Sequence, residues 1–282
     1  MTLTVLRTGP MTVLKDHGRP GHAGQGVAQS GAVDRSAYAR ANALVGNAPG
    51  AAVLECTLGG LRVRVEEPAT IVLTGTDAVL VVDGVRTAVE EVVRVPAGAE
   101  VTVTMPRRGL RSYLAVRGGF DVPPVLGSRS TDQIAGVGPP RPAPGDILPI
   151  GPPPTGEALA GSAPEETGGP FEIDLGPRDD WFTAEAVEML LGAEFTVSPA
   201  SNSVGLRLDG PALARSRTDE LPSEGVVRGS IQVPPDGHPI VFQADHPVTG
   251  GYPVIAVLTP AAADRAAQAR PGSKIRFAIA PD

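Results

Sequence analysis

The sequence SEGVVRGSIQVPPDGHPIVFQADHPVTGGYPVIAVL, residues 223–258, decides how the rest of the chain is interpreted. Two short strand patterns, residues 230–233 and 239–243, are separated by the turn-forming run Pro-Pro-Asp-Gly. A third apolar run, Val254–Leu258, follows a polar segment that ends in Thr-Gly-Gly-Tyr-Pro. Paired glycines allow positive φ values and let a ligand approach the backbone closely. The segment predicts either a polar site at the mouth of a β-sheet or a hairpin corner whose Asp and His cap turns.

The composition of the whole chain favours many short strands joined by turns. Its 282 residues include 35 glycines and 30 prolines, which interrupt apolar runs such as residues 69–73 and 79–82. Helical patterns are confined to residues 34–45, 180–191 and 261–269. We therefore predict a mainly β fold with a few short helices, built as a barrel or a sandwich rather than from βαβ units.

Charge and residue counts exclude several classes of function. The net charge of −7 argues against nucleic acid as a partner. The chain has only two lysines, Lys15 and Lys274, and lacks the G-x-x-x-x-G-K-[ST] phosphate-binding loop. Cys56 is the only cysteine and lies in an apolar strand pattern, so we expect a small buried hydrophobic residue.

No targeting or membrane segment is expected from the sequence. The N-terminal residues lack the basic start and the long apolar core of a signal peptide, and no run reaches the ~18 apolar residues of a membrane span. A single cysteine suits a reducing compartment, so we expect a cytoplasmic location with no membrane partner.

An internal similarity indicates a duplicated module. The tripeptide Gly-Leu-Arg at residues 60–62 recurs at residues 205–207, each time after a helix pattern and a strand pattern. A repeated β-rich unit explains this similarity, and chance resemblance between Gly- and Leu-rich strands is the alternative. The expected parts are a first β-barrel at residues 1–150, a Pro/Gly-rich linker or loop at residues 151–170, and a second β-barrel at residues 171–282.

Several long motifs, occurring in one order over nearly the whole chain, resemble the KipA-like family, also called allophanate hydrolase subunit 2 or the 5-oxoprolinase C subunit. These motifs are GRPGHAGQGVAQSGAVDRSAYARANALVGN from Gly18, YLAVRGGFDVPPVLGSRST from Tyr113, SPASNSVGLRLDGP from Ser198, and the segment from Ser223. The resemblance implies two tandem cyclophilin-like β-barrels and a place among the biotin-dependent carboxyltransferases.

The resemblance also implies partners and an activity. It implies the C subunit of an ATP-dependent 5-oxoprolinase, inactive alone, that works with a KipI-like B subunit, together with a LamB/YcsF-like A subunit, to open 5-oxo-L-proline to L-glutamate. ATP is then used by the assembled complex, and no metal is expected on this chain. One alternative is a carboxyltransferase for urea or a related amide, whose biotin is carried on another polypeptide because this chain has no Met-Lys dipeptide. Another is a regulatory module that antagonises a KipI-like inhibitor of a histidine kinase.

Amide chemistry sets the requirements of the site that the resemblance implies. Breaking amide resonance places negative charge on the carbonyl oxygen, which needs fixed hydrogen-bond donors, and the nitrogen needs an acid or a base. Asp245 and His246 are the candidate acid and base, with a role as turn residues as the alternative. Tyr252 is the third candidate catalytic residue, and the alternative is that its ring packs at a barrel end.

Substrate binding has its own candidates. An arginine pairs well with a carboxylate such as that of 5-oxoproline, a glutamine with an amide, and consecutive backbone N–H groups with an anion. The alternatives are a surface salt bridge and a polar residue at the end of a barrel. The candidate residues are Asn202, Arg207, Gln232, Thr249, Gly250 and Gly251.

Polar residues of the first half carry weaker signals. Asp16, His17 and His22 fit no strong zinc-binding spacing, so we do not expect a metal there. The run Ser128-Arg129-Ser130 follows a glycine and can hold an anion or contact a partner. Asp34 precedes a helical pattern and is expected to cap that helix.

Overall fold

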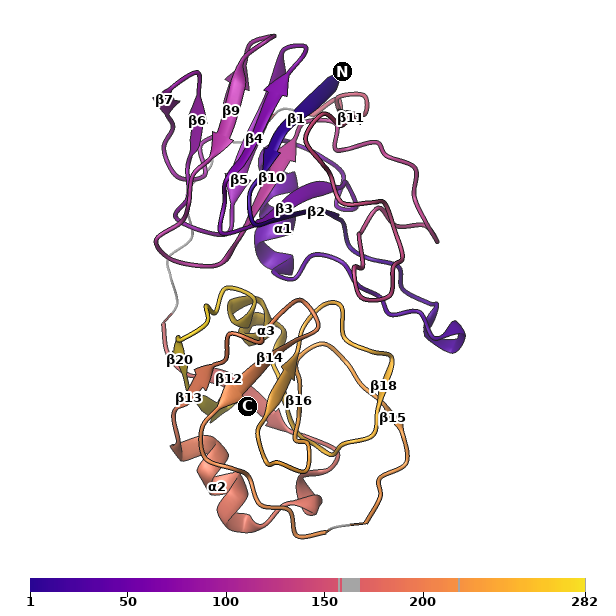
Figure 1. The fold of residues 1–282 in the computed structure, drawn as a ribbon, viewed down its shortest axis with the longest axis vertical. Helices are drawn as coiled ribbons and strands as arrows, with labels where there is room; N and C mark the ends of the chain where they lie inside the picture. The colour runs from indigo at the N-terminus through magenta and orange to yellow at the C-terminus, as the bar shows by residue number, and fades with distance from the viewer. Residues whose placement is uncertain (157, 159–167, 218, 282) are drawn as a thin grey trace. The chain divides into compact units, whose positions relative to one another are not determined.

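Short strands make up most of the regular structure, as the apolar runs between glycines and prolines predicted. The computed structural model describes residues 1–156, 158, 168–217 and 219–281, and within these ranges three α-helices accompany many strands (Figure 1). The mainly β fold with a few short helices is therefore confirmed. Across the described ranges, no helix has the length and apolar character needed to cross a membrane.

Contacts between residues divide the chain into two units. The first unit comprises Met1–Arg19 and Ser30–Glu165, and the second comprises Pro20–Gln29 and Glu166–Asp282. The short segment Pro20–Gln29 thus groups with the second half of the chain, which the sequence did not indicate. Of the predicted linker, residues 157 and 159–167 lie outside the described residues, and the predicted boundaries stay a prediction.

Two antiparallel sheets form the first unit. The six-stranded sheet has the order β11 (Ile147–Pro149), β1 (Thr2–Thr8), β4 (Leu61–Val65), β9 (Glu100–Val103), β6 (Leu80–Val82) and β7 (Val85–Arg86). The five-stranded sheet has the order β2 (Met11–Lys15), β3 (Val53–Thr57), β10 (Arg111–Val116), β5 (Ala69–Thr74) and β8 (Val93–Val95).

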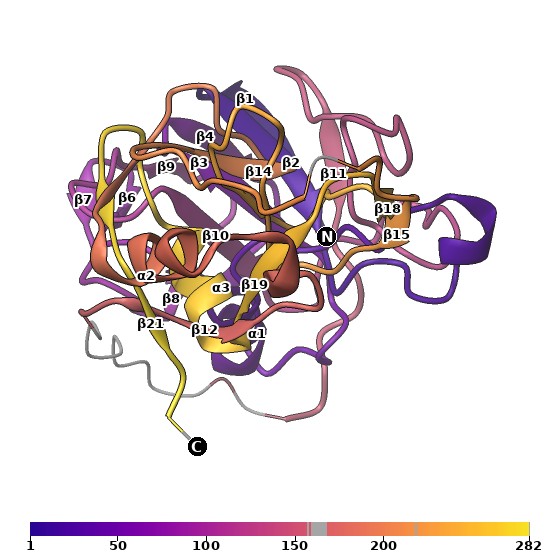
Figure 2. The same cartoon turned by 90° about the horizontal axis from the view of Figure 1, so that it is seen from below.

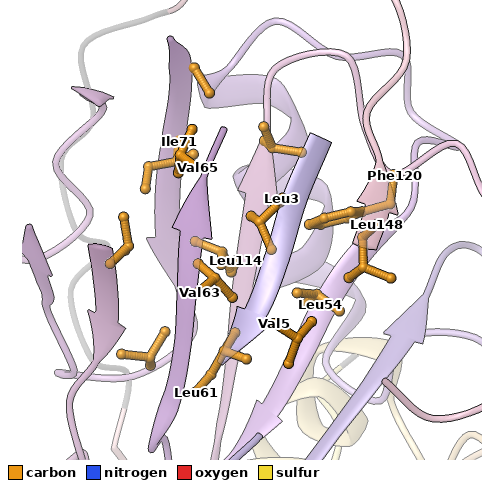
Figure 3. Packing of buried hydrophobic residues seen from close by; sticks show 14 of the residues in the cluster. Leu3, Val5, Leu54, Leu61, Val63, Val65, Ile71, Leu114, Phe120 and Leu148 are labelled. Carbon is orange, nitrogen blue, oxygen red and sulfur yellow. The ribbon is translucent and has the colours of Figure 1, made fainter. Parts of the chain in front are cut away.

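Apolar side chains from both sheets fill a common core (Figure 3). In β4 the buried residues Leu61, Val63 and Val65 alternate with outward-facing arginines, the period-two pattern of a strand with one wet face. Leu54 and Leu114 enter the same core from the five-stranded sheet. Alternation along a strand therefore determines which of its faces points inward.

Helix α1 (Arg35–Leu44) explains why β10 is buried along its whole length. Leu114 and Val116 of β10 face the common core, whereas Tyr113 and Ala115 pack with α1. A strand covered on both faces reads as a continuous apolar run, as residues 113–116 of β10 do.

Asp34 caps α1, as predicted. Its side-chain oxygen accepts hydrogen bonds from the backbone N–H of Ala37 (2.9 Å) and the hydroxyl of Ser36 (2.8 Å). We expect Asp34→Ala to lower the free energy of unfolding by about 1 kcal/mol, because the Ala37 N–H loses its acceptor. Chemical denaturation measures the change, and Asp34→Asn, which keeps the accepting oxygen, should recover most of it. Equal losses in both variants would contradict the capping role.

Cys56 lies in β3 and is fully buried. Burial raises the pKa of its thiol to about 12, so almost no thiolate is present near neutral pH. We expect no reaction of the folded protein with a thiol reagent at pH 8, and one thiol per chain in guanidinium chloride. Rapid labelling of the folded chain would contradict this burial.

The second unit is built on one eight-stranded sheet that nearly closes into a barrel. Its order is β20 (Lys274–Ile275), β13 (Phe195–Val197), β14 (Gly205–Asp209), β17 (Ile240–Phe242), β16 (Ser230–Gln232), β19 (Val254–Leu258), β12 (Phe171–Leu175) and β21 (Phe277–Ile279). The two outermost strands, β20 and β21, are separated in sequence only by Arg276. One continuous segment therefore pairs with both ends of the sheet, which brings those ends together.

Two helices pack on this sheet: α3 (Pro260–Ala266) lies against β12 and β19, and α2 (Ala184–Gly192) lies beside β21 (Figure 2). The predicted start of α2 at Asp180 is wrong. Residues Asp179–Trp181 form a separate 3-10 turn, Phe182 is extended, and the hydroxyl of Thr183 caps the helix by accepting the N–H of Ala186.

Candidate active site

The side-chain amide of Gln232 lies at the end of β16 and packs on a glycine of a neighbouring loop. Gln232 is 4% exposed, and its Nε2 donates a 2.8 Å hydrogen bond to the carbonyl oxygen of Tyr252. A Cβ atom on Gly250 would lie 2.4 Å from that nitrogen, so only glycine leaves room for the amide. Pairing between β18 (Thr249–Gly250) and β15 (Glu224–Gly225) fixes the position of this glycine.

Tyr252 and Arg215 extend this group of side chains. The guanidinium carbon of Arg215 lies 5.9 Å from the centre of the Tyr252 ring, and Tyr252 is 44% exposed. Nη2 of Arg215 donates to the carbonyl oxygen of Val233, the residue that follows Gln232. The structure thus brings three predicted site residues, Gln232, Gly250 and Tyr252, together with an arginine that sequence reasoning missed. We call Arg215, Gln232, Gly250 and Tyr252 the Gln232 cluster.

Arg215 carries the charge of the Gln232 cluster. Burial lowers the pKa of its guanidinium below the ordinary value, although Tyr252 and Asp236 act in the opposite direction. A guanidinium still remains protonated in a protein, so the effect of burial is a cation with less water around it. Such a cation attracts an anion more strongly than a fully hydrated one does.

Thr249 and Gly251 adjoin Gly250 in the chain, whereas Asn202, Asp245 and His246 are separated from the Gln232 cluster by the topology of the sheet. Strands β17 and β19 flank β16 and are both antiparallel to it. Both therefore start at the Gln232 end of β16 and finish at its Ser230 end, so the chain between them runs from the Ser230 end back to the Gln232 end. Asp245 lies where β17 has just ended, and its N–H donates to the carbonyl oxygen of Ser203 (2.9 Å). Asn202 belongs to the same end, where its side-chain oxygen accepts the N–H of Val204 (2.8 Å).

The side chains at that other end differ in their exposure. Asp245 is buried, whereas His246 is half-buried and stacks on Phe242 with ring centres 5.9 Å apart. Nδ1 of His246 lies 2.7 Å from the carbonyl oxygen of Pro247. Arg207, in the middle of β14, does not belong to that end, because it pairs with Ile240, which also pairs with Gln232; its side chain is exposed. The predicted residues therefore do not form a single pocket.

The paired glycines do not use the positive φ values that glycine allows. Neither Gly250 nor Gly251 adopts the left-handed backbone conformation, and Gly250 belongs to the extended β18. Close approach is the reason for glycine at position 250, where the Gln232 amide occupies the space of a side chain. Gly251 is open, with its nearest neighbour for an added Cβ, the Leu221 oxygen, at 4.0 Å.

A buried polar junction in the first unit connects two of the sequence motifs. The carboxylate of Asp16 accepts the N–H groups of Gly18 (2.8 Å) and Arg129 (2.5 Å). It also accepts the hydroxyls of Ser128 (2.6 Å) and Ser130 (2.7 Å). Both hydroxyls therefore donate to an internal carboxylate. They are not available as donors to an external anion at the run Ser128-Arg129-Ser130.

Arg19 lies beside this junction and was also missed by sequence reasoning. It is 1% exposed, and its Nη2 donates to the carbonyl oxygen of Ser130. Its Nε and Nη1 have no hydrogen-bond partner in the part of the chain that the structure describes. Over the same residues, no group of three or more His, Cys, Asp and Glu side chains is arranged to hold a metal ion.

The fold and the Gln232 cluster define a β-barrel protein with a polar site that contains a side-chain amide and an arginine. The chain belongs to the family described as carboxyltransferase domain, subdomain A and B, whose family model matches residues 25–279. The resemblance seen in the sequence motifs is thereby confirmed.

Individual relatives agree with this assignment. The chain is 38% identical to the 5-oxoprolinase C subunit of Escherichia coli, over 98% of this chain and 90% of that protein. It is 30% identical to the 5-oxoprolinase C subunit of Haemophilus influenzae, with the same shares covered. The crystal structure of Kluyveromyces lactis urea carboxylase is similar with a TM-score of 0.93 and 28% identity, over 99% of this chain and 27% of that one.

Proposed function

We propose that this chain is the C subunit of an ATP-dependent 5-oxoprolinase, which opens 5-oxo-L-proline to L-glutamate. The observation that carries the proposal is the 38% identity to a protein named as the C subunit of 5-oxoprolinase, which this chain matches over nine-tenths of its length. The proposed partners are a KipI-like B subunit and a LamB/YcsF-like A subunit. We place the complex in the cytoplasm, and the assembled complex consumes ATP. This chain is inactive alone in the proposal, because its sequence lacks a phosphate-binding loop.

The Gln232 cluster supplies chemistry that ring opening requires. As water or another nucleophile adds to the lactam carbonyl, negative charge builds on its oxygen, and fixed hydrogen-bond donors stabilise that charge. The Gln232 amide is the candidate donor, and the Tyr252 carbonyl oxygen holds it in place. Groups already held in place need little reorganisation as the charge develops.

Asp245 and His246 stay predictions as acid and base. They lie at the end of β16 away from the Gln232 cluster, so Asp245→Asn separates two interpretations. A catalytic Asp245 predicts lower turnover with partner binding intact. A purely regulatory module that binds a KipI-like protein predicts no effect of the same change.

Reconstitution tests the proposed function directly. We expect the three co-expressed chains to release glutamate from 5-oxo-L-proline only with ATP, and omission of this chain to abolish the release. Assays of every pair of chains provide the control for residual activity. Undiminished turnover in the pair that lacks this chain would reject the proposal.

Carboxyl transfer to urea or a related amide is a second candidate, favoured by the similarity to urea carboxylase. Biotin would supply the activated carboxyl group, and this chain has no Met-Lys dipeptide to carry it. Of its two lysines, Lys15 is 1% exposed. A separate biotin carrier is therefore part of this candidate. Transfer of labelled carboxylate from carboxybiotin to urea, without ATP-dependent glutamate release, would favour it over the first.

A further inference from the structure

Most arginines of the second unit already have a carboxylate partner. Such ion pairs neutralise their charge and leave little for a ligand. The pairs are Arg178 with Glu224, Arg217 with Asp180, Arg228 with Asp264, Arg265 with Glu172, and Arg276 with Glu194.

Arg215 differs from these arginines because its contacts are neutral. One Nη2 hydrogen goes to the Val233 carbonyl oxygen, and the face of the guanidinium lies over the Tyr252 ring. Its Nε has no hydrogen-bond partner in the described part of the second unit, and no described carboxylate forms an ion pair with it. The side chain as a whole is half-exposed, so a solute can reach it. A cation that is partly dehydrated and not neutralised favours an anionic ligand.

The surroundings of Arg215 also define the shape of that ligand. A guanidinium is planar and pairs best with planar anions such as carboxylates, which it can bind through two parallel hydrogen bonds. The same cluster contains the Gln232 amide, which suits an amide group. A small molecule that carries a carboxylate close to an amide matches both groups.

We propose that Arg215 binds the carboxylate of the substrate and thereby selects a carboxylate-bearing lactam over a neutral amide such as urea. This inference rests on the proposed function, whose substrate 5-oxo-L-proline has a lactam and a carboxylate on one ring. It assigns to Arg215 the role that the sequence predicted for Arg207, which lies exposed in β14.

The test compares 5-oxo-L-proline with 2-pyrrolidinone, the same lactam without its carboxylate. In the reconstituted complex, Arg215→Gln should raise the KM for 5-oxo-L-proline about 10- to 100-fold, the change expected when a hydrogen bond to a charged group is lost. The inhibition constant of 2-pyrrolidinone should stay within about twofold, since that ligand has no carboxylate to lose. Arg215→Lys, which keeps the charge but not the planar fork, should fall between Gln and wild type.

Arg217→Gln is the matched control. Arg217 also lies over an aromatic ring, that of Trp181 at 5.8 Å, but it is already paired with Asp180. The inference would be overturned if Arg215→Gln left the KM for 5-oxo-L-proline unchanged, or raised that KM and the inhibition constant of 2-pyrrolidinone equally. It would also be overturned if Arg207→Gln, and not Arg215→Gln, raised the KM for 5-oxo-L-proline alone.

Failure of the proposed function can be told apart from failure of this inference. If the wild-type complex does not open 5-oxo-L-proline, the proposed function is rejected, and titration calorimetry of the full chain with the same two lactams decides the role of Arg215. Tighter binding of 5-oxo-L-proline than of 2-pyrrolidinone, lost in Arg215→Gln, supports it. Equal binding by the wild type and the variant overturns it.

Discussion

Asp16→Ala is expected to lower the free energy of unfolding of the first unit by about 3–5 kcal/mol. Asp16 is 2% exposed, and its carboxylate accepts hydrogen bonds from two backbone N–H groups and from the hydroxyls of Ser128 and Ser130. Removing the carboxylate leaves these buried donors without an acceptor, and each unsatisfied buried group costs about 1–3 kcal/mol. Partial relaxation around the smaller side chain keeps the total below the sum.

The measurement can assign the loss to one unit. Trp181 is the only tryptophan and belongs to the second unit, so its fluorescence follows that unit, whereas far-UV circular dichroism follows both. We expect the midpoint of chemical denaturation to fall more by dichroism than by fluorescence. Asp121→Ala is the control, because Asp121 is exposed and forms only a surface pair with Arg129, at a cost within about 1 kcal/mol. Similar shifts in both variants would contradict the junction as the source of stability.

Periodicity in the sequence predicted the strands well, because burial on one face is recorded at every second residue. Leu61, Val63 and Val65 identify β4 in this way, and the strand spans Leu61–Val65 in the structure. The start of α2 was less predictable. Asp180 and Thr183 are both good caps, and only the packing of Trp181 and Phe182 in the core decides that the helix begins after Thr183.

The candidate site was only partly predictable, since sequence neighbours become spatial neighbours only where the chain turns back. Asp245 and Tyr252 are seven positions apart, yet the return of the chain between β17 and β19 places them at different ends of β16. Arg215 gave no signal, because it lies in an irregular segment without apolar alternation or a motif. Arg19 was hidden for a related reason, since a charged residue among glycines normally indicates an exposed loop.

Gly250→Ala should reduce kcat/KM of the assembled enzyme by about 10- to 100-fold while the fold is retained. The new Cβ would lie 2.4 Å from Nε2 of Gln232, so the amide must move and its hydrogen bond to Tyr252 must break. Stability should fall by only about 1–2 kcal/mol, the cost of one broken hydrogen bond, because Gly250 has no left-handed conformation and the displaced atom ends a flexible side chain. Displacing a positioning group by about 1 Å is enough for losses of this size.

Its neighbour Gly251 offers a close control. Both glycines lie in the same loop without positive φ, but a Cβ on Gly251 has no neighbour nearer than 4.0 Å. Gly251→Ala should therefore keep both activity and stability. If it lowers activity as much as Gly250→Ala does, the effect belongs to the loop as a whole and not to the amide of Gln232.

A double-mutant cycle identifies the group through which Gly250 acts. Gln232→Ala alone should lower kcat/KM about as much as Gly250→Ala, because both remove the amide from its place. On the Gln232→Ala background, Gly250→Ala should then add less than about twofold, since two changes that remove one interaction are not additive. If the losses in kcat/KM of the two single variants multiply in the double variant, Gly250 serves another purpose, such as leaving room for the substrate itself. Non-additive effects would show that the missing Cβ exists to seat the Gln232 amide.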